Sequence, residues 1–368
     1  MNKPIRHVLG ISGGKDSAAL AIYLKNNYPQ LEVEYYSSDT GKELDETYKL
    51  IDNLQVYLEK KITVLKAADG SGLNPFDHFL KMYGGFLPST QARWCTKKLK
   101  LEPFEKYVGT DPVVSYVGIR GDEEREGYIS RRGNIQSIFP FRKNIWSEDV
   151  IDKFLSNVNV EKVIALTESV DLGSRRNRFV EVLRKSVNPG YMQASKLAQL
   201  MDEGVRELNY LVFEFLKGTN YPLSKEASFP LLDNEEVIVR DDVFRILEES
   251  GVGVPAYYKK VGYQVGTKEG AYSRSRSGCF FCFYQQKIEW VWLYEQHPTL
   301  FKMAMEYEKE GYTWNQEESL EELIRPERVE QIKSDYIKRQ ERTVGPKSSF
   351  LLDILDDTEE NGCASCFI

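Results

Sequence analysis

The sequence contains few of the residues on which several common chemistries depend. Only 3 of its 368 residues are histidines, which argues against catalysis built on a histidine base. Its 5 cysteines are too few for the disulfide framework of a secreted chain of this length, so we expect metal ligands or reactive thiols. No apolar run approaches the length of a membrane span, and residues 1–6 lead into the first expected strand without a signal-peptide core. We therefore expect a cytoplasmic protein without membrane contact.

The chain also lacks an excess of basic residues. Its formal net charge of -7 argues against indiscriminate binding of nucleic acid, although a local basic face remains compatible with that charge. A chain of this length with 41% hydrophobic residues can bury one large core or two smaller ones. The composition thus predicts one main domain with an insertion or an appendage.

A glycine-rich stretch near the N-terminus gives the clearest signal. Apolar residues Val8 and Leu9 precede it, residues with helical spacing follow it, and between them the sequence reads Ser12-Gly13-Gly14-Lys15-Asp16-Ser17. Such a strand–turn–helix presents backbone N–H groups and the positive end of a helix dipole to an anion, for which phosphate is expected. The spacing differs from the Walker loop. The alternative, a plain glycine turn, requires six specified residues to coincide by chance.

Strands and helices alternate after this stretch, which predicts a doubly wound parallel sheet of the α/β class. Further strands are expected at residues 31–36, 61–65 and 113–117. The second ends near Asp39 and Thr40, and the fourth is followed closely by Arg120. Ligands bind at the carboxyl ends of such strands, so Asp39 and Thr40 are candidates for binding a nucleotide or its Mg²⁺. The alternative is that they only cap a helix.

The cysteines permit three interpretations. Cys279 and Cys282 form a C-x-x-C pair among phenylalanines, a spacing that lets both sulfurs face one ion. Together with Cys363 and Cys366 they could instead hold a structural Zn²⁺ in a four-cysteine site. Reduced thiols without a metal are the third interpretation.

Together these motifs resemble the phosphoadenosine phosphosulfate (PAPS) reductase superfamily, whose members have an adenine nucleotide alpha hydrolase fold that is Rossmann-like and carries a PP-loop. The resemblance rests on the glycine stretch, Asp39-Thr40-Gly41 with Glu46-Thr47-Tyr48, Cys95 with Lys97-Lys98 and Glu102-Pro103, and Gly118-Ile119-Arg120. It implies a nucleotide-binding domain over residues 1–155, a helical insertion over 156–228, a continuation with the C-x-x-C segment over 229–300, and a mainly helical C-terminal region with a cysteine-bearing tail over 301–368.

The resemblance also implies roles for particular residues. The intact glycine stretch is similar to members that bind ATP and cleave it between the α- and β-phosphates, whereas reductases usually have a degraded one. The implied nucleotide-binding residues are Ser12, Gly13, Gly14, Lys15, Asp16, Ser17, Asp39 and Thr40. The implied catalytic residues are Lys15, Asp16, Arg120 and Cys366. Lys15 would neutralise the β- and γ-phosphates, Asp16 would hold the loop or Mg²⁺, and Arg120 would counter charge near the α-phosphate.

A metal cofactor follows from the same resemblance. Cys95, Cys279 and Cys282 match positions that ligate a [4Fe–4S] cluster, with Cys363 a candidate fourth ligand. Three protein ligands leave one iron open to exogenous sulfur. Cys363 or Cys366 could also act as a nucleophile or accept a persulfide.

Three functions are compatible with these patterns. The first is ATP-dependent adenylation of an oxygen followed by sulfur transfer, similar to the DndC-type sulfurtransferases of DNA phosphorothioation, with a cysteine desulfurase as the sulfur donor. The second is a PAPS or adenosine phosphosulfate reductase that uses a tail cysteine. The third is a nucleotide-binding accessory subunit without turnover. The arginines of residues 175–178 suggest either a contact to DNA or a solvated helix face. The sequence does not indicate an oligomeric state.

Overall fold

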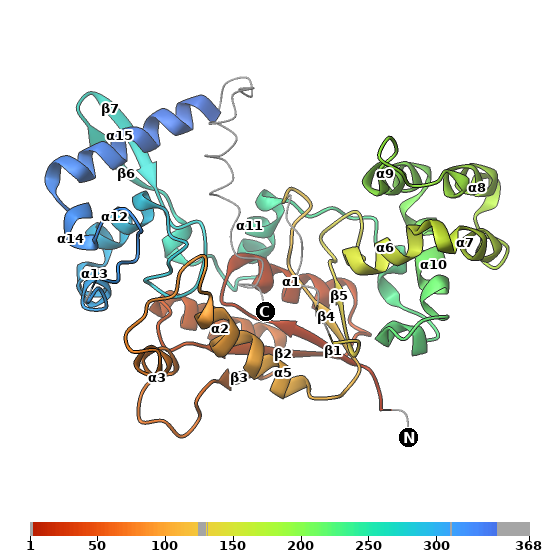
Figure 1. Ribbon diagram of the computed structural model, residues 1–368, viewed down its shortest axis with the longest axis horizontal. Coiled ribbons are helices and arrows are strands. Elements are labelled where there is room, and N and C mark those ends of the chain that lie inside the picture. Colours follow the sequence, from red (N-terminus) through yellow and green to blue (C-terminus); the bar gives the residue numbers. More distant parts are fainter. Residues whose placement is uncertain (1–2, 124–129, 131, 310, 344–368) are drawn as a thin grey trace.

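A five-stranded parallel sheet lies at the centre of the computed structural model, which describes residues 3–123, 130, 132–309 and 311–343 (Figure 1). The strand order is β3-β2-β1-β4-β5, and every neighbouring pair is parallel. The strands are β1 (Arg6–Gly10), β2 (Val33–Asp39), β3 (Ile62–Lys66), β4 (Val113–Tyr116) and β5 (Ile135–Ile138). The predicted fold class is confirmed. The sequence patterns predict the first four strands and give no sign of β5.

The strand order creates a switch point beside β1. The chain builds β2 and β3 on one side of β1 and then returns to place β4 on the other side. The helices of this half are α1 (Lys15–Asn27), α2 (Asp45–Leu58), α3 (Pro75–Met82), α4 (Trp94–Thr96) and α5 (Glu102–Val108), with a π-helical turn at Lys97–Leu101. In a sheet of this kind the crevice at the carboxyl ends of β1 and β4 is the expected ligand site.

The central helix α1 is covered on several sides. Each of its residues from Lys15 to Leu24 is buried, because the helix packs against β1, α2 and α11 (Arg240–Glu249). An apolar stretch of alanine, leucine and isoleucine is therefore required along nearly the whole helix, not on one face only. This burial fixes the start of α1, and with it the glycine stretch, relative to the sheet.

The segment predicted as an insertion is helical. Residues 156–228 contain four helices and short 3₁₀ turns, and together with α6 they form the yellow and green helical region beside β5 in Figure 1. The helices are α6 (Glu148–Leu155), α7 (Val160–Leu166), α8 (Arg176–Arg184), α9 (Gln193–Glu203) and α10 (Val205–Leu216). Their apolar side chains belong to the same buried cluster as those of α1 and β1. Whether the segment is a separate domain stays a prediction.

The C-terminal part packs around an apolar core that it shares with Phe76 and Trp94 of the sheet domain. It comprises an antiparallel hairpin and four helices: β6 (Val261–Val265), β7 (Lys268–Tyr272), α12 (Lys287–Gln296), α13 (Pro298–Met305), α14 (Leu320–Leu323) and α15 (Pro326–Thr343). In this core Phe281 stacks on Trp314, with ring centroids 4.8 Å apart, and also meets Phe76 of α3 at 4.5 Å. The C-x-x-C segment is thereby held between the C-terminal helices and the sheet domain.

Within the described residues, none of the helices combines the length and the apolar character needed to cross a bilayer.

Candidate nucleotide and sulfur site

The glycine loop, residues 12–17, connects the carboxyl end of β1 to the first turn of α1. Gly13 has a φ of +71°, and a Cβ atom there would lie 2.2 Å from Cγ2 of Thr47. A Cβ atom on Gly14 would lie 2.6 Å from Oγ of Ser277. Gly13 therefore requires glycine for conformation and space, whereas a side chain at Gly14 would have to displace the Ser277 hydroxyl. The loop closes on itself through a 3.2 Å hydrogen bond from Oγ of Ser17 to the Gly14 carbonyl.

Three charged side chains meet at the start of α1. Lys15, Asp16 and Arg120 are 7%, 4% and 9% exposed. Oδ2 of Asp16 accepts from Nζ of Lys15 at 2.7 Å, and Oδ1 accepts from Nη1 of Arg120 at 2.7 Å. Arg120 also pairs with Asp122 at 2.8 Å and with Glu123 at 2.9 Å. Two buried cations thus surround one carboxylate at the positive end of a helix, where an anion is favoured.

Burial and charge shift the pKa values of this cluster. Burial acts to raise the pKa of Asp16, but Lys15 and Arg120 outweigh it and hold that pKa below its usual range. Burial lowers the pKa of Lys15, and the neighbouring Arg120 charge lowers it further, against the opposing effect of Asp16. The lysine therefore loses its proton more easily than an exposed lysine does. A bound anion would raise its pKa again.

The end of β4 lies directly against the glycine loop. A Cβ atom on Gly118 would approach the backbone oxygen of Asp16 to 2.9 Å and its carbonyl carbon to 3.0 Å. This close contact brings Arg120, two residues later, to the Asp16 side chain. The predicted position of Arg120 at the same sheet edge as the loop is confirmed.

Two tyrosines hold the loop from the other side. The Tyr257 hydroxyl donates to the Gly13 carbonyl at 3.1 Å, and the Tyr258 hydroxyl accepts from the Lys15 amide at 3.4 Å. The Lys15 ammonium also lies 5.4 Å from the centre of the Tyr258 ring. Sequence reasoning did not assign these residues to the site. Their signal in the sequence is the aromatic pair that follows Gly253 and Pro255.

Asp39 is the last residue of β2, and Thr40 follows it in the turn before α2. Oδ1 of Asp39 accepts from the Gly41 amide at 2.8 Å and from the Tyr48 hydroxyl at 3.0 Å. The Thr40 hydroxyl donates to Oε1 of Glu43 at 2.6 Å. Neither residue is the N-cap of α2, which begins after Leu44. Their binding of nucleotide or Mg²⁺ stays a prediction, because these contacts also account for them as turn residues.

The C-x-x-C segment, residues 279–282, lies beside the same turn. Cys279 forms an isolated antiparallel bridge with Glu43, and its Sγ lies 3.2 Å from Oγ1 of Thr40. The Phe280 amide donates to the Lys42 carbonyl at 2.9 Å. The chain therefore brings the cysteine pair to the carboxyl end of β2, although about 240 residues separate the two in sequence.

Cys95 of α4 packs against the same apolar cluster as Cys279. Burial and, to a smaller extent, the charge of a Cys282 thiolate raise the pKa of the Cys95 thiol to about 12. Burial likewise raises the pKa values of Cys279 and Cys282. Lys100 opposes the rise in all three. That these three cysteines ligate one cluster stays a prediction.

In the described part of the chain, no group of three or more histidine, cysteine, aspartate or glutamate side chains is arranged to hold a single metal ion. The cysteines of an iron–sulfur cluster bind different irons, so their sulfurs need not converge on one point. The thiols, their partial burial and their aromatic surroundings are compatible with such a cluster. The zinc alternative and both tail assignments involve Cys363 and Cys366, which lie outside the described residues.

The arginines predicted as a possible DNA contact are paired with glutamates. Arg175 lies 2.8 Å from Glu207, Arg176 lies 3.0 Å from Glu168, and Arg178 lies 3.5 Å from Glu203. These exposed pairs fit the alternative interpretation of a solvated helix face.

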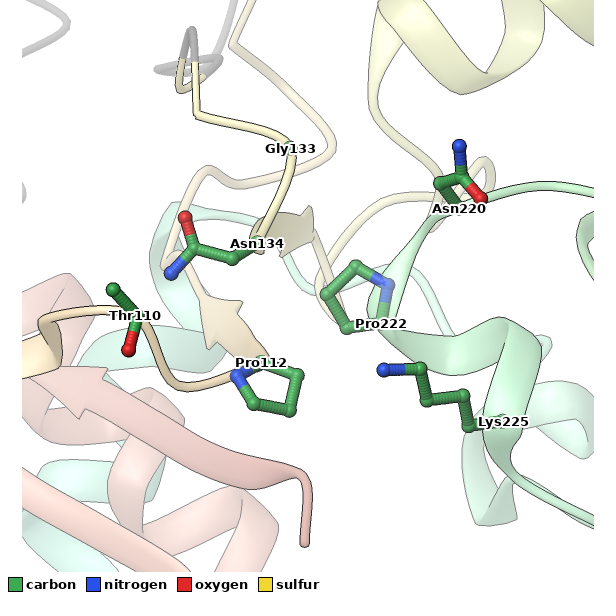
Figure 2. Close-up of a pocket in the computed structure, with 7 residues that line it drawn as sticks. All are labelled: Thr110, Pro112, Gly133, Asn134, Asn220, Pro222 and Lys225. Atoms are coloured by element: carbon green, nitrogen blue, oxygen red, sulfur yellow. The ribbon is translucent and has the colours of Figure 1, made fainter. Parts of the chain in front are cut away.

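A small hollow lies at the opposite edge of the sheet. Its lining includes Thr110 and Pro112 before β4, Asn134 before β5, and Lys225, as Figure 2 shows. Its volume of about 200 Å³ is small for a nucleotide, and it faces the amino ends of the strands. The hollow is therefore not the site described above.

Comparisons with known proteins agree with this fold. Residues 6–163 of the chain match the phosphoadenosine phosphosulfate reductase domain family. Relatives include two uncharacterized proteins of Methanocaldococcus jannaschii. MJ0066 is 31% identical over 161 residues, which are 40% of this chain and 31% of that protein. MJ0973 is 27% identical over 168 residues, which are 41% and 38% of the two chains.

A viral protein also matches. The uncharacterized nin region protein ORF290 of Escherichia phage lambda is 28% identical over 145 residues, which are 32% of this chain and 49% of that protein. The chain thus spans less than half the length of each of these relatives. The family match covers residues 6–163, not the whole chain.

Proposed function

We propose that this protein cleaves ATP between the α- and β-phosphates, transfers the AMP group to an oxygen of an acceptor, and then replaces that activated oxygen with sulfur. The observation that carries this proposal is the buried pairing of Lys15 and Arg120 around Asp16 at the positive end of α1. Two cations beside a glycine loop suit a pyrophosphate leaving group, whose charge increases as the α–β bond breaks.

The residues of the cluster have separable roles in this reaction. The loop amides and Lys15 bind the β- and γ-phosphates, and Arg120 stabilises charge that develops near the α-phosphate. Asp16, which accepts from both cations in the absence of ligand, binds Mg²⁺ when the nucleotide arrives and so releases both cations to the phosphates. Tyr257 and Tyr258 keep the loop in the shape that fits the nucleotide.

The cysteines supply the sulfur side of the proposal. Cys95, Cys279 and Cys282 would hold a [4Fe–4S] cluster, with Cys363 as a candidate fourth ligand. Such a cluster would supply an iron with an open position for exogenous sulfide. Sulfide would attack the phosphorus of the acceptor, and AMP would leave together with the activated oxygen. The hydrogen-bonded turn at Thr40 and Glu43 keeps Cys279 beside the sheet edge that receives the nucleotide. A cysteine desulfurase is the proposed sulfur donor, with a thiol reductant that releases its persulfide sulfur as sulfide. The phosphate oxygen of DNA, as in DndC-type phosphorothioation, is the proposed acceptor.

The test is pyrophosphate release from ATP by protein that is purified without oxygen, with and without DNA and sulfide. We expect pyrophosphate formation that requires Mg²⁺ and is lost in Lys15→Met. Arg184→Met, in an exposed arginine of α8, is the matched control and should retain it. Sulfite release from PAPS that depends on thioredoxin and on Cys366 would instead establish the reductase. Nucleotide binding without turnover under any of these conditions would establish an accessory subunit.

The cofactor is tested separately on the same preparation. We expect a brown protein with about four irons per chain and an EPR signal on reduction. Replacing Cys95, Cys279 or Cys282 by alanine should remove the colour, whereas a colourless protein with one zinc would contradict the cluster. Zinc would leave the proposal for ATP cleavage standing, because that proposal depends on the loop.

A further inference from the structure

Arg274 is a buried cation with most of its donors unused. Only 2% of the residue is exposed. Its Nη2 donates to the Cys279 carbonyl at 3.1 Å. Among the described residues, its buried Nε and Nη1 have no hydrogen-bond partner, and the guanidinium forms no ion pair with a carboxylate.

A buried guanidinium with unused donors is an unusual feature of a folded protein. Arginine keeps its charge at every physiological pH, and a buried charge without a counter-charge destabilises the fold. Buried polar groups in proteins are otherwise nearly always paired. An arginine that binds an anionic ligand gains its counter-charge only when that ligand is present.

The surroundings of Arg274 connect the two halves of the proposed site. Its backbone amide donates to the carbonyl of Tyr257 at 2.9 Å, and the hydroxyl of the same tyrosine binds the Gly13 carbonyl. Three residues further along the chain, Ser277 contacts Gly14 of the loop, and Cys279 follows. Arg274 therefore belongs to the short segment that runs from the glycine loop to the cysteines.

The charge of Arg274 affects both a cysteine of the C-x-x-C segment and a tyrosine that holds the glycine loop. Burial raises the pKa of Cys282, and the Arg274 charge opposes that rise. Burial also raises the pKa of Tyr257, and Arg274 opposes this rise as well. An anion that lies near the guanidinium is thus close to both the loop and the thiols.

We propose that Arg274 binds a tetrahedral oxyanion between the glycine loop and the cysteines, through the donors that the protein leaves unused. The inference rests on the proposed function, in which the reacting phosphate and the incoming sulfur meet in this region. Planar guanidinium donors suit phosphate and sulfate oxygens. The two sources of such an anion are the α-phosphate of a bound nucleotide and a free sulfur oxyanion, and both present the same chemistry to Arg274.

The test is isothermal titration of the full-length protein with ATP, pyrophosphate and sulfate, each added separately. Arg274→Met removes the charge at similar length, and Arg274→Lys keeps the charge with fewer donors. Arg184→Met is the matched exposed control. For Arg274→Met we expect the affinity for ATP or for sulfate to fall about tenfold or more, while pyrophosphate, which the loop binds alone, changes less than about twofold. A loss for ATP identifies the α-phosphate, and a loss for sulfate alone identifies a free oxyanion.

Thermal unfolding without ligand separates this role from a structural one. Because Arg274 is an uncompensated charge in the ligand-free protein, its replacement by methionine should leave the unfolding midpoint unchanged or raise it. A lowered midpoint with unchanged binding of ATP and sulfate would overturn the proposal, as would an equal loss of pyrophosphate affinity. If Arg274→Met does not fold, the affinities of Arg274→Lys for ATP, pyrophosphate and sulfate test the proposal instead. If the parent protein binds neither ATP nor pyrophosphate, the proposed function fails, and the sulfate titration still tests Arg274.

Discussion

Arg120 and Asp16 lie 104 positions apart in the sequence, and a 2.7 Å hydrogen bond joins Nη1 of the arginine to Oδ1 of the aspartate. The bond connects the segment after β4 to the first turn of α1, across the switch point of the sheet. Because Lys15 binds the other oxygen of the same carboxylate, Asp16 holds the two cations in position for an anion.

Replacing Asp16 by asparagine should therefore destabilise the protein in a pH-dependent way. At pH 7 we expect a loss of about 3 kcal/mol in the free energy of unfolding, because buried Lys15 loses its carboxylate partner and Arg120 keeps only Asp122 and Glu123. The folded-state pKa of Asp16 lies below the ordinary value of 3.8. Its contribution is thus present above that value and is lost as the pH falls through the lowered pKa. Urea unfolding at pH 7 and at pH 3 measures the difference.

The exposed Asp69 provides the control for this experiment. Asp69→Asn should change the free energy of unfolding by less than about 0.5 kcal/mol at either pH. A loss in Asp16→Asn that is equally large at both pH values would contradict the assignment, because it would not come from the carboxylate charge.

Nucleotide affinity should fall as the pH rises above 8. Burial lowers the pKa of Lys15 from its ordinary value of 10.5, and a bound phosphate anion raises it again. Binding therefore takes up a proton in the window between the lowered pKa of the free protein and the raised pKa of the complex. Above pH 8 the phosphates of ATP no longer titrate, so isothermal titration from pH 8 to pH 10 reports on the protein.

Lys15→Arg is the matched variant for this pH dependence. A guanidinium stays charged throughout the range, so the variant should bind ATP with an affinity that does not decline between pH 8 and pH 10. The same decline in the parent and in Lys15→Arg would show that another group titrates.

Gly118→Ala should disrupt the loop without touching any charged side chain. The added Cβ would lie 2.9 Å from the backbone oxygen of Asp16, and backbone atoms cannot rotate away as a flexible side chain can. We expect a loss of about 1 to 3 kcal/mol in stability together with weaker ATP binding. Gly72→Ala, where nothing lies within 4 Å of the added atom, should change neither. Unaltered ATP binding in Gly118→Ala would contradict the tight contact between β4 and the loop.

The sequence predicts those parts of the site whose signals are local. Six adjacent residues specify the glycine loop, and the rule that parallel strands end at one sheet edge places Arg120 near it. Tyr258 and Tyr257 could not be assigned in this way, because they reach the loop from 243 and 244 positions away through tertiary packing alone. Arg274 is similar. Its sequence context does not reveal that its donors are buried and unpaired.

The cysteines illustrate the same limit. Their number and the C-x-x-C spacing are visible in the sequence, and the family resemblance adds Cys95. Their position beside Thr40 depends on an antiparallel bridge between Glu43 and Cys279, which no local sequence pattern predicts. Likewise, the sequence shows the arginines of residues 175–178 but not the glutamates from other segments that pair with them.

The buried environment of Cys95 should make it slow to alkylate in metal-free protein. Its pKa is raised to about 12, so at pH 8 we expect reaction with iodoacetamide at least about 100-fold slower than that of glutathione, because the thiolate is the reactive form. The rate should rise about tenfold per pH unit up to pH 10, and peptide mapping by mass spectrometry follows each cysteine separately. Lys100→Gln should slow Cys95 further, because Lys100 lowers its pKa, whereas Lys97→Gln, at an exposed position, should not. A rate that levels off below pH 10 would mean that limited access, and not thiolate formation, controls the reaction.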